Sequence, residues 1–196
     1  MRKIRRITKR HRKTRKKGGK LGSCINSNSY NKGNPLQVNS STWFLHYDKN
    51  NPNIIIKEIG PSVWLDDDTI KAELDTSQRA SDLNIGPKVH YTCFDDKNKI
   101  GYLVMDRIDG ITIDRILETA NNSVKNKILA KAQELFNKLY ENGIYHRDIH
   151  AGNLMWGRTQ SDKTQRLWII DFGMIENLNE NSRQEEPPTI TYRNIS

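Results

Sequence analysis

The sequence predicts an α+β fold in which an antiparallel sheet with one helix precedes a mainly helical part. Three observations support this assignment. Two pairs of short apolar runs, each joined by a polar turn, have the pattern of β-hairpins. A segment between them begins with acidic residues and has helical character, and a later segment repeats its apolar residues with helical spacing. The hairpins occupy about residues 42–59 and 88–105, and the helices about 66–84 and 123–142.

The chain begins with a strongly basic segment. Residues 1–20 hold twelve of the 32 Lys and Arg residues and no acidic residue, within a chain of formal charge +9. The segment lacks the apolar centre of a secretory signal, so we expect a disordered basic arm over residues 1–22. Such an arm can bind nucleic acid, act as a nuclear address or lie on an anionic surface. A solvated tail without a specific partner is the alternative.

A hairpin is predicted after a polar linker. Residues 21–38 are rich in Ser, Asn and Gly and indicate a linker or a loosely ordered first strand. Residues 42–59 then contain two aromatic or β-branched runs around an Asn- and Pro-containing turn. Lys57 interrupts the second run, on the same face as Ile55 and Ile59, because side chains alternate along a strand. A lysine there either extends to solvent or serves an inward-facing function.

The first helix is predicted after this hairpin. Residues 66–68 are all Asp, which favours a helix N-terminus, and Asn84-Ile85-Gly86-Pro87 ends the helical segment. Residues 88–94 and 100–105 then predict two further strands around a polar turn.

The second helix is predicted over residues 123–142. Apolar residues recur there with the spacing of a buried helix face, and Asn142-Gly143 provides a favourable C-cap.

The stretch after this helix carries three polar residues, each at the end of a short apolar run: Asp148, Asn153 and Asp171. A strand that stops at a carboxylate places it at the edge of a sheet, facing a cleft. There the carboxylate can hold a hard cation or a proton in transit. This arrangement suits phosphoryl transfer, which depends on positioning and charge neutralisation more than on covalent chemistry.

The spacing of these residues resembles the catalytic core of the protein-kinase-like superfamily. His146-Arg147-Asp148 is followed by Asn153, five residues after the Asp, and then by Asp171-Phe172-Gly173. The resemblance implies a two-lobed fold whose N-lobe is the antiparallel sheet with one helix. It also implies that Asp148 accepts the substrate hydroxyl proton, and that Asn153 and Asp171 ligate Mg²⁺ bridging the ATP phosphates.

The resemblance extends to the N-lobe. It implies that Lys57 contacts the α- and β-phosphates of ATP. It also implies an acidic partner for Lys57 on the first helix, for which Glu73 is our choice and Asp75 the second choice. The segment after the last strand matches the hinge, whose backbone groups bind the adenine edge. The adenine-binding candidates are Met105, Asp106, Ile108 and Asp109, and Asp109 either reaches the ribose or caps the turn before Gly110.

The glycine-rich phosphate loop of the superfamily is missing. Counting back from Lys57 by the usual spacing reaches Asn39-Ser40-Ser41, which contains no glycine. Ser40 and Ser41 remain candidates for phosphate contacts, but the close backbone approach that glycine permits is lost. We therefore expect weaker nucleotide binding.

Two further departures indicate an atypical, compact member. His150 makes the catalytic loop similar to those of aminoglycoside phosphotransferases, choline kinases and UbiB-type atypical kinases, although it could also bond only the loop backbone. Only 23 residues follow Gly173, so we expect a truncated, mainly helical C-lobe similar to those of the Bud32 and RIO types. The basic arm and the Asn- and Ile-rich core are also similar to small kinase-like proteins of large DNA viruses.

These assignments divide the chain into a basic arm (1–22), an N-lobe (23–104), a minimal C-lobe with the catalytic and metal-binding loops (105–178) and a polar tail (179–196). No apolar stretch approaches the ~18–20 residues of a membrane span. Cys24 and Cys93 are far apart and belong to no Cys/His cluster, so neither a disulfide nor a zinc site is expected. We expect a cytoplasmic or nuclear protein, in a host cell or virion if viral.

The predicted function is an ATP- and Mg²⁺-dependent phosphotransferase, with an atypical serine/threonine protein kinase acting on a protein substrate as first choice. One alternative is a small-molecule phosphotransferase similar to aminoglycoside or choline kinases. The other is a pseudokinase docking module whose basic arm binds nucleic acid.

Overall fold

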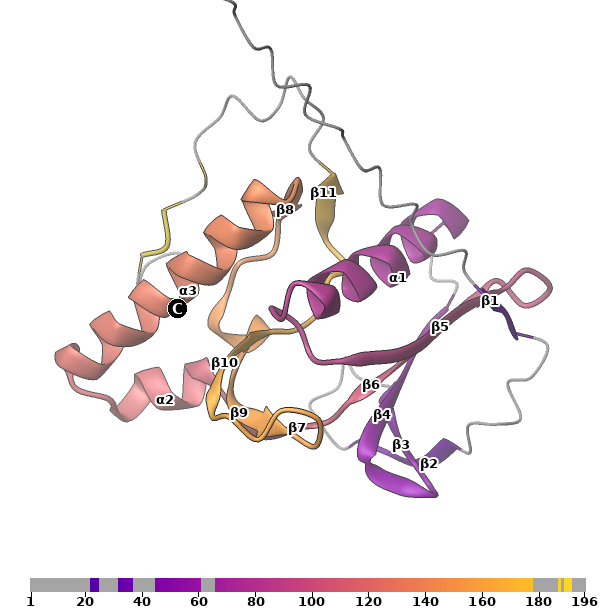
Figure 1. Ribbon diagram of the computed structural model, residues 1–196, viewed down its shortest axis with the longest axis horizontal. Helices are drawn as coiled ribbons and strands as arrows, with labels where there is room; N and C mark the ends of the chain where they lie inside the picture. Colours follow the sequence, from indigo (N-terminus) through magenta and orange to yellow (C-terminus); the bar gives the residue numbers. More distant parts are fainter. Residues whose placement is uncertain are drawn as a thin grey trace, which may run out of the picture.

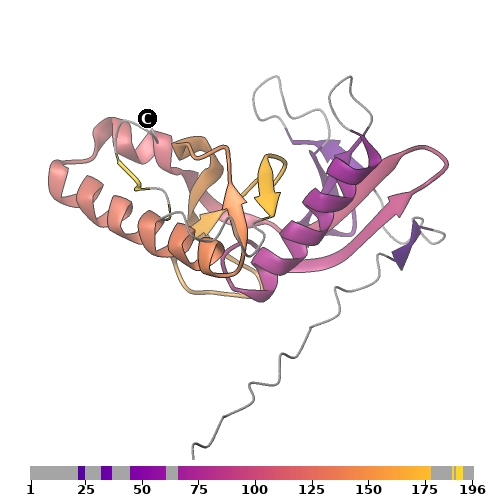
Figure 2. The same cartoon turned by 90° about the horizontal axis from the view of Figure 1, so that it is seen from above.

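The protein consists of two lobes joined by the chain segment after β6. A computed structural model describes residues 22–24, 32–36, 45–60, 66–177, 187 and 189–191. One lobe contains a six-stranded sheet and helix α1, and the other contains helices α2 and α3 with two small sheets (Figure 1). Figure 2 shows the helical end and the sheet end of the molecule on opposite sides of β8 and β11. The predicted α+β class is confirmed.

The N-lobe sheet has the strand order β1-β5-β6-β4-β3-β2. Its four central strands form the two predicted hairpins, because β3 pairs with β4 and β5 pairs with β6, both antiparallel. These strands are β3 (Leu45–Asp48), β4 (Asn51–Ile59), β5 (Val89–Asp95) and β6 (Ile100–Asp106). The edges are β1 (Gly22–Ser23), which is parallel to β5, and β2 (Lys32–Pro35), which is antiparallel to β3.

Helix α1 (Asp67–Asp82) covers one face of this sheet. Asp66 caps its N-terminus by accepting a hydrogen bond from the backbone N–H of Thr69 at 2.8 Å, which satisfies one of the unpaired donors of the first turn. Ile70 and Leu74 belong to the same buried cluster as strand residues such as Leu103. This packing fixes the position of α1 over β5 and β6.

The two cysteines form a disulfide between Cys24 and Cys93. The expectation that neither cysteine would be paired is therefore wrong. Gly22 lies opposite Cys93 in the parallel β1–β5 pair, so strand pairing brings together two residues that are 69 positions apart in sequence. Sequence spacing carries no signal of such a pairing.

The C-lobe is built around helix α3 (Asn122–Glu141), which the apolar periodicity predicts. Strand β8 (Ile144–His146) follows it and pairs with β11 (Ile175–Asn177). A second sheet has the order β10-β9-β7. Its strands are β7 (Ile108–Thr112), β9 (Leu154–Thr159) and β10 (Arg166–Ile169). A short helix, α2 (Ile113–Thr119), which the sequence analysis did not predict, connects β7 to α3.

The C-lobe core includes a residue from the predicted polar tail. Ile190 is buried in the cluster that contains Phe136 of α3, and its backbone N–H donates to Oε1 of Gln133 at 2.6 Å. A purely polar tail is therefore the wrong description of residues 189–191, since an apolar side chain there covers the core next to α3.

Among the described residues, no helix is long and apolar enough to cross a membrane. The predicted basic arm lies outside the described residues, except for Gly22 at its end.

Candidate active site

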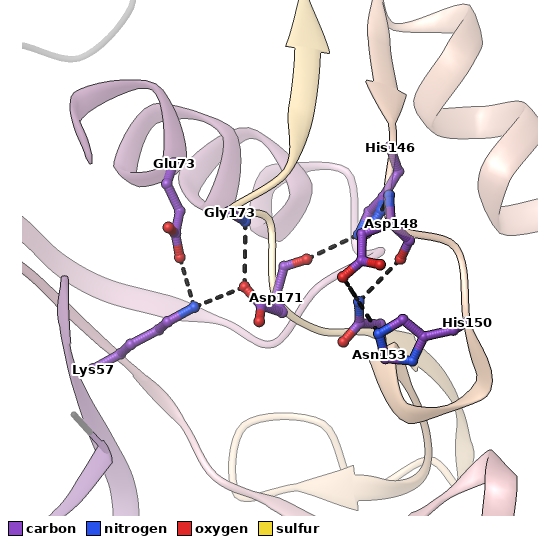
Figure 3. Close-up of polar contacts among 8 residues, drawn as sticks. All are labelled: Lys57, Glu73, His146, Asp148, His150, Asn153, Asp171 and Gly173. Atoms are coloured by element: carbon purple, nitrogen blue, oxygen red, sulfur yellow. Dashed lines mark hydrogen bonds and ion pairs between the residues drawn. The ribbon is translucent and has the colours of Figure 1, made fainter. Parts of the chain in front are cut away.

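Three charged side chains from three different elements meet between the lobes (Figure 3). Nζ of Lys57, on β4, lies 2.6 Å from Oε1 of Glu73 on α1 and 2.8 Å from Oδ1 of Asp171, which follows β10. Asp75, the second-choice partner of Lys57, instead lies 3.9 Å from Arg79 on the exposed side of α1. The helical period places Glu73 on the buried face of α1, where it can reach the sheet.

The environment shifts the pKa values of all three groups. Burial opposes the charged form of Lys57, but Glu73 and Asp171 outweigh burial, so the pKa of this lysine is raised. Burial dominates at Glu73, and its pKa is raised despite the attraction of Lys57. At Asp171 burial is outweighed by Lys57 and by the hydrogen bond from the Gly173 N–H, so its pKa is lowered. The most exposed carboxylate of the site is therefore the one held most firmly in its charged form.

Asp171 has a left-handed backbone conformation, with φ of 62°. This conformation is uncommon for residues other than glycine. Two hydrogen bonds hold it: Nε2 of His146 pairs with the Asp171 carbonyl at 2.8 Å, and the Gly173 N–H donates to Oδ1 at 3.2 Å. Burial lowers the pKa of His146, so this ring is neutral at pH 7. Its Nδ1 accepts from the backbone N–H of Asp148 at 3.3 Å, so Nε2 carries the proton and donates. His146 thereby connects Asp171 to the loop that carries Asp148.

The loop after β8 holds Asp148 and Asn153 in contact. Nδ2 of Asn153 donates to Oδ2 of Asp148 at 2.9 Å and to the Asp148 carbonyl at 3.0 Å. Asn153 is buried within the single turn of η2 (Ala151–Asn153), whereas the Asp148 carboxylate is 42% exposed. The amide therefore orients the carboxylate without covering it.

Arg147 has a protein carboxylate as its partner. Its guanidinium forms an ion pair with Glu176 on β11, and its backbone N–H donates to the Met174 carbonyl at 2.9 Å. The segment after Asp171 is thus tied to the catalytic loop through β8 and β11.

A pocket lies beside the charged triad and encloses about 320 Å³ of empty space, including its open mouth. Four predicted site residues line it: Lys57, Glu73, Met105 and Asp171. The sequence analysis did not identify the other residues that line the pocket, which are Ser77, Pro87, Val89, Leu103, Ile170 and Phe172. The two-residue period of β4 and β6 could have indicated Leu103, because it lies opposite Lys57 in the antiparallel ladder.

The remaining residues that the sequence predicts to contact the nucleotide are not found among the described residues that line this pocket. Ser40 and Ser41 lie outside the described residues. Ile108 begins β7 and lies opposite Thr159 of β9, and the carboxylate of Asp109 lies 3.6 Å from Nε of Arg158. Among the described residues, Asp106, Ile108 and Asp109 do not line the pocket described above.

Asp106 is buried at the junction of the lobes, where its carboxylate is bonded on two sides. Nε2 of His90, on β5, lies 2.7 Å from Oδ1, and the backbone N–H of Ser161, in the β9–β10 turn, donates to Oδ2 at 3.1 Å. Burial alone would raise the pKa of Asp106, but the bonds from His90, Ser161 and Thr159 lower it. The side chain therefore connects strand β5 of the N-lobe to the β9–β10 turn of the C-lobe.

The donor set suits Mg²⁺ that is shared with a phosphate ligand. Asn153 offers an amide oxygen, because its nitrogen is used by Asp148, and Asp171 offers a partly exposed carboxylate. Mg²⁺ commonly takes one or two such protein oxygens and completes its shell with phosphates and water. Within the described ranges no group of three or more His, Cys, Asp or Glu side chains could hold a metal alone.

Comparisons with known proteins agree with this geometry. A family model described as the ABC1 atypical kinase-like domain matches residues 76–191, more than half of the chain. "Probable protein kinase UbiB" of Pasteurella multocida is 32% identical over 84 residues, which cover 42% of this chain and 16% of the relative. "Serine/threonine-protein kinase PknB" of Mycobacterium tuberculosis is 32% identical over 76 residues, which cover 37% of this chain and 11% of the relative.

A solved structure also matches. The kinase PK-1 of Cydia pomonella granulovirus superposes with a TM-score of 0.59 at 25% identity, covering 77% of this chain and 53% of that chain. The matched segments amount to less than a fifth of the length of the curated relatives. The family match begins at residue 76, after Lys57 and Glu73, so for these two residues the site geometry provides the argument.

Proposed function

Because the chain belongs to the ABC1 atypical kinase-like family, we propose that it is an ATP- and Mg²⁺-dependent phosphotransferase. One observation carries the proposal. Lys57, Glu73 and Asp171 converge from β4, α1 and the segment after β10, and His146 links Asp171 to the loop that holds Asp148 and Asn153. The ammonium group of Lys57 and the oxygens of Asp171 and Asn153 could then hold the phosphates and the metal, next to the Asp148 carboxylate that would bind the acceptor hydroxyl. Phosphoryl transfer requires such an arrangement.

Each residue of the triad has a distinct role in this proposal. Lys57 binds the α- and β-phosphates, and Glu73 restricts the direction in which the ammonium group points. Asp171 and Asn153 would hold Mg²⁺, which when bound neutralises charge on the phosphate oxygens. Because the Asp171 carboxylate is 51% exposed whereas that of Glu73 is 5% exposed, Asp171 is the one accessible to a metal–nucleotide complex.

Asp148 has the role of orienting the acceptor hydroxyl and accepting its proton. The side chain is exposed enough for an acceptor to approach, and Asn153 fixes its direction. Positioning of this kind replaces a bimolecular encounter by a prearranged geometry.

The adenine base would lie against Met105, with the hinge backbone at Asp106 and Ile108 as its hydrogen-bonding edge and Asp109 near the ribose. The backbone N–H of Asp106 already donates to the Lys88 carbonyl at 2.8 Å, and that of Arg107 donates to the Asn53 carbonyl at 2.7 Å. The carbonyl of Asp106 and the N–H of Ile108 are therefore the groups we propose for the base.

A protein serine or threonine is the acceptor we propose. This choice is supported by the similarity to UbiB, a probable protein kinase, and to PknB, a serine/threonine-protein kinase. A metabolite hydroxyl is the second candidate. It is favoured by His150, because the resemblance described above includes small-molecule kinases with a histidine at this place in the loop.

The basic segment at residues 1–20 is proposed to bind a polyanion such as nucleic acid, because it contains twelve Lys and Arg residues and no acidic residue.

The test is a transfer assay with γ-labelled ATP and Mg²⁺. The acceptors are a generic basic protein, the chain itself and a panel of aminoglycosides and choline. Asp171→Ala should abolish transfer, because a catalytic metal contact contributes several kcal/mol of transition-state stabilisation. Asp75→Ala, which removes an exposed carboxylate of α1, is the control and should retain activity. Transfer to metabolites alone would select the second candidate. Equal turnover by Asp171→Ala and the wild type would overturn the assignment of the site.

A further inference from the structure

The imidazole of His150 makes two contacts with different chemistry, and Figure 3 shows the one with Asp148. Its Nδ1 lies 3.1 Å from the backbone nitrogen of Gly152, and its Nε2 lies 3.3 Å from Oδ2 of Asp148. The sequence allowed His150 to bond only the loop backbone, but the ring reaches both the backbone and the carboxylate proposed to accept the substrate proton.

The first contact determines which nitrogen of the ring carries the proton. A backbone N–H can only donate, so Nδ1 of His150 must accept and is unprotonated. The proton of the neutral ring is then on Nε2, which faces Asp148. The neutral ring therefore turns an N–H toward the carboxylate, with Nε2 at 3.3 Å from Oδ2, and the loop fixes the orientation of the ring.

Two side-chain nitrogens approach the same oxygen of the Asp148 carboxylate. Nδ2 of Asn153 donates to Oδ2 at 2.9 Å, and Nε2 of His150 faces the same atom. Within the described part of the chain, no hydrogen bond or ion pair to Oδ1 of Asp148 is found. The two oxygens of this carboxylate are thus in different environments.

We propose that His150 is a positioning residue that anchors Oδ2 of Asp148, so that Oδ1 is the oxygen presented to the acceptor hydroxyl. This inference rests on the proposed phosphotransferase function. In the reaction the proton of the acceptor hydroxyl passes to Oδ1, the hydroxyl oxygen forms a bond to the γ-phosphorus, and the bond from the γ-phosphorus to the β–γ bridging oxygen breaks, releasing ADP. A long contact of 3.3 Å in the substrate-free protein is compatible with this role, because catalytic hydrogen bonds tighten when substrate binds.

Gly152 contributes space for the ring. A Cβ atom at this position would lie 2.9 Å from both Cε1 and Nδ1 of His150, closer than side-chain carbons approach other atoms. The absence of a side chain at Gly152 therefore allows the imidazole to sit between the η2 backbone and Asp148.

The first test needs no activity. Long-range ¹H–¹⁵N spectra of the full chain at pH 7.5 report which ring nitrogen is protonated, and the His150 signals are assigned by their absence from His150→Gln. The expected result is a protonated Nε2 and an unprotonated Nδ1. A protonated Nδ1 would overturn the proposal, whether or not the protein transfers phosphate.

The second test separates the two contacts with a matched pair of variants. In His150→Asn the amide reaches the Gly152 N–H but is too short to reach Asp148, whereas in His150→Gln the amide nitrogen replaces Nε2. With transfer assayed as above, kcat of His150→Asn should fall about 10–100-fold, on the scale of a misplaced catalytic group, and KM for ATP should stay within about twofold. His150→Gln should recover most of kcat.

Equal kcat values for His150→Asn and the wild type would overturn the proposal, and so would a His150→Gln variant as slow as His150→Asn. A wild-type protein without transfer activity would instead count against the proposed function, and the tautomer measurement would still decide the present inference.

Discussion

Nζ of Lys57 and Oδ1 of Asp171 lie 2.8 Å apart, although 114 residues separate them in the sequence. Lys57 belongs to the N-lobe sheet, and Asp171 follows the last strand of the C-lobe hairpin. The ion pair is therefore a direct contact between the lobes at the site that we propose for the triphosphate. The energy of this ion pair depends on the positions of both lobes. Three structural features that hold the lobes in place can be tested separately.

The close packing of α1 on the sheet depends on Gly101. A Cβ atom at Gly101 would lie 2.6 Å from Cγ2 of Ile70 and 3.2 Å from Cδ1 of Leu74. Gly101→Ala should therefore lower the free energy of unfolding by about 1–3 kcal/mol, as overpacking does, and shift the helix that carries Glu73. Urea denaturation measures the effect. Gly60→Ala is the control, because a Cβ atom there would lie 3.8 Å from its nearest neighbour, Cγ1 of Ile100. Equal losses of stability for the two variants would contradict this account.

The Cys24–Cys93 disulfide should stabilise the N-lobe. It joins residues 69 positions apart, and crosslinks that close loops of this size contribute about 2–4 kcal/mol by restricting the unfolded chain. Adding a reductant should lower the Tm of the wild type and leave that of Cys24→Ser unchanged. Two free thiols by mass spectrometry of the protein purified without reductant would contradict the crosslink.

The buried carboxylate of Asp106 should make stability depend on pH at the acidic end. Its pKa is lowered in the fold because bonds from His90, Ser161 and Thr159 outweigh burial. The folded state thus binds this proton more weakly than the unfolded chain does. The stabilising contribution is complete above the ordinary pKa of about 3.8 and is lost as the pH falls through the lower folded value.

Measured between pH 7 and pH 2, the stability difference between the wild type and Asp106→Asn should shrink as the pH falls below about 4. The change amounts to about 1.4 kcal/mol for each pH unit by which the pKa is depressed. Asp109→Asn, which removes an exposed carboxylate on the next strand, is measured beside it as the control. A constant difference for Asp106→Asn across this range would be inconsistent with the buried pair.

The sequence predicts those elements whose signal is local. The hairpins β3–β4 and β5–β6 and the helices α1 and α3 follow from strand alternation, helix caps and apolar spacing. The choice of Glu73 over Asp75 as the residue facing Lys57 agrees with the observed contact, because the resemblance and the helical period select the same face.

The features that the sequence analysis missed depend on contacts between distant residues. The seven-residue helix α2 is too short for periodicity to identify, and Asp109-Gly110 reads as a turn although it lies within β7. The partners of Ile190 and Cys93 come from other parts of the chain, so neither burial nor pairing is visible in the local pattern.

The most direct measurement is a thermal-shift titration with ATP and Mg²⁺. Wild type, Lys57→Ala and Lys97→Ala, an exposed turn lysine, are compared at the same concentrations. A ligand that binds only the folded state stabilises it by RT ln(1 + [L]/Kd), about 2.7 kcal/mol at 100 times Kd. The account predicts a rising Tm for the wild type and Lys97→Ala, and a response of Lys57→Ala that is absent or needs much more nucleotide. A flat wild-type response at millimolar nucleotide, or equal titrations for wild type and Lys57→Ala, would contradict it.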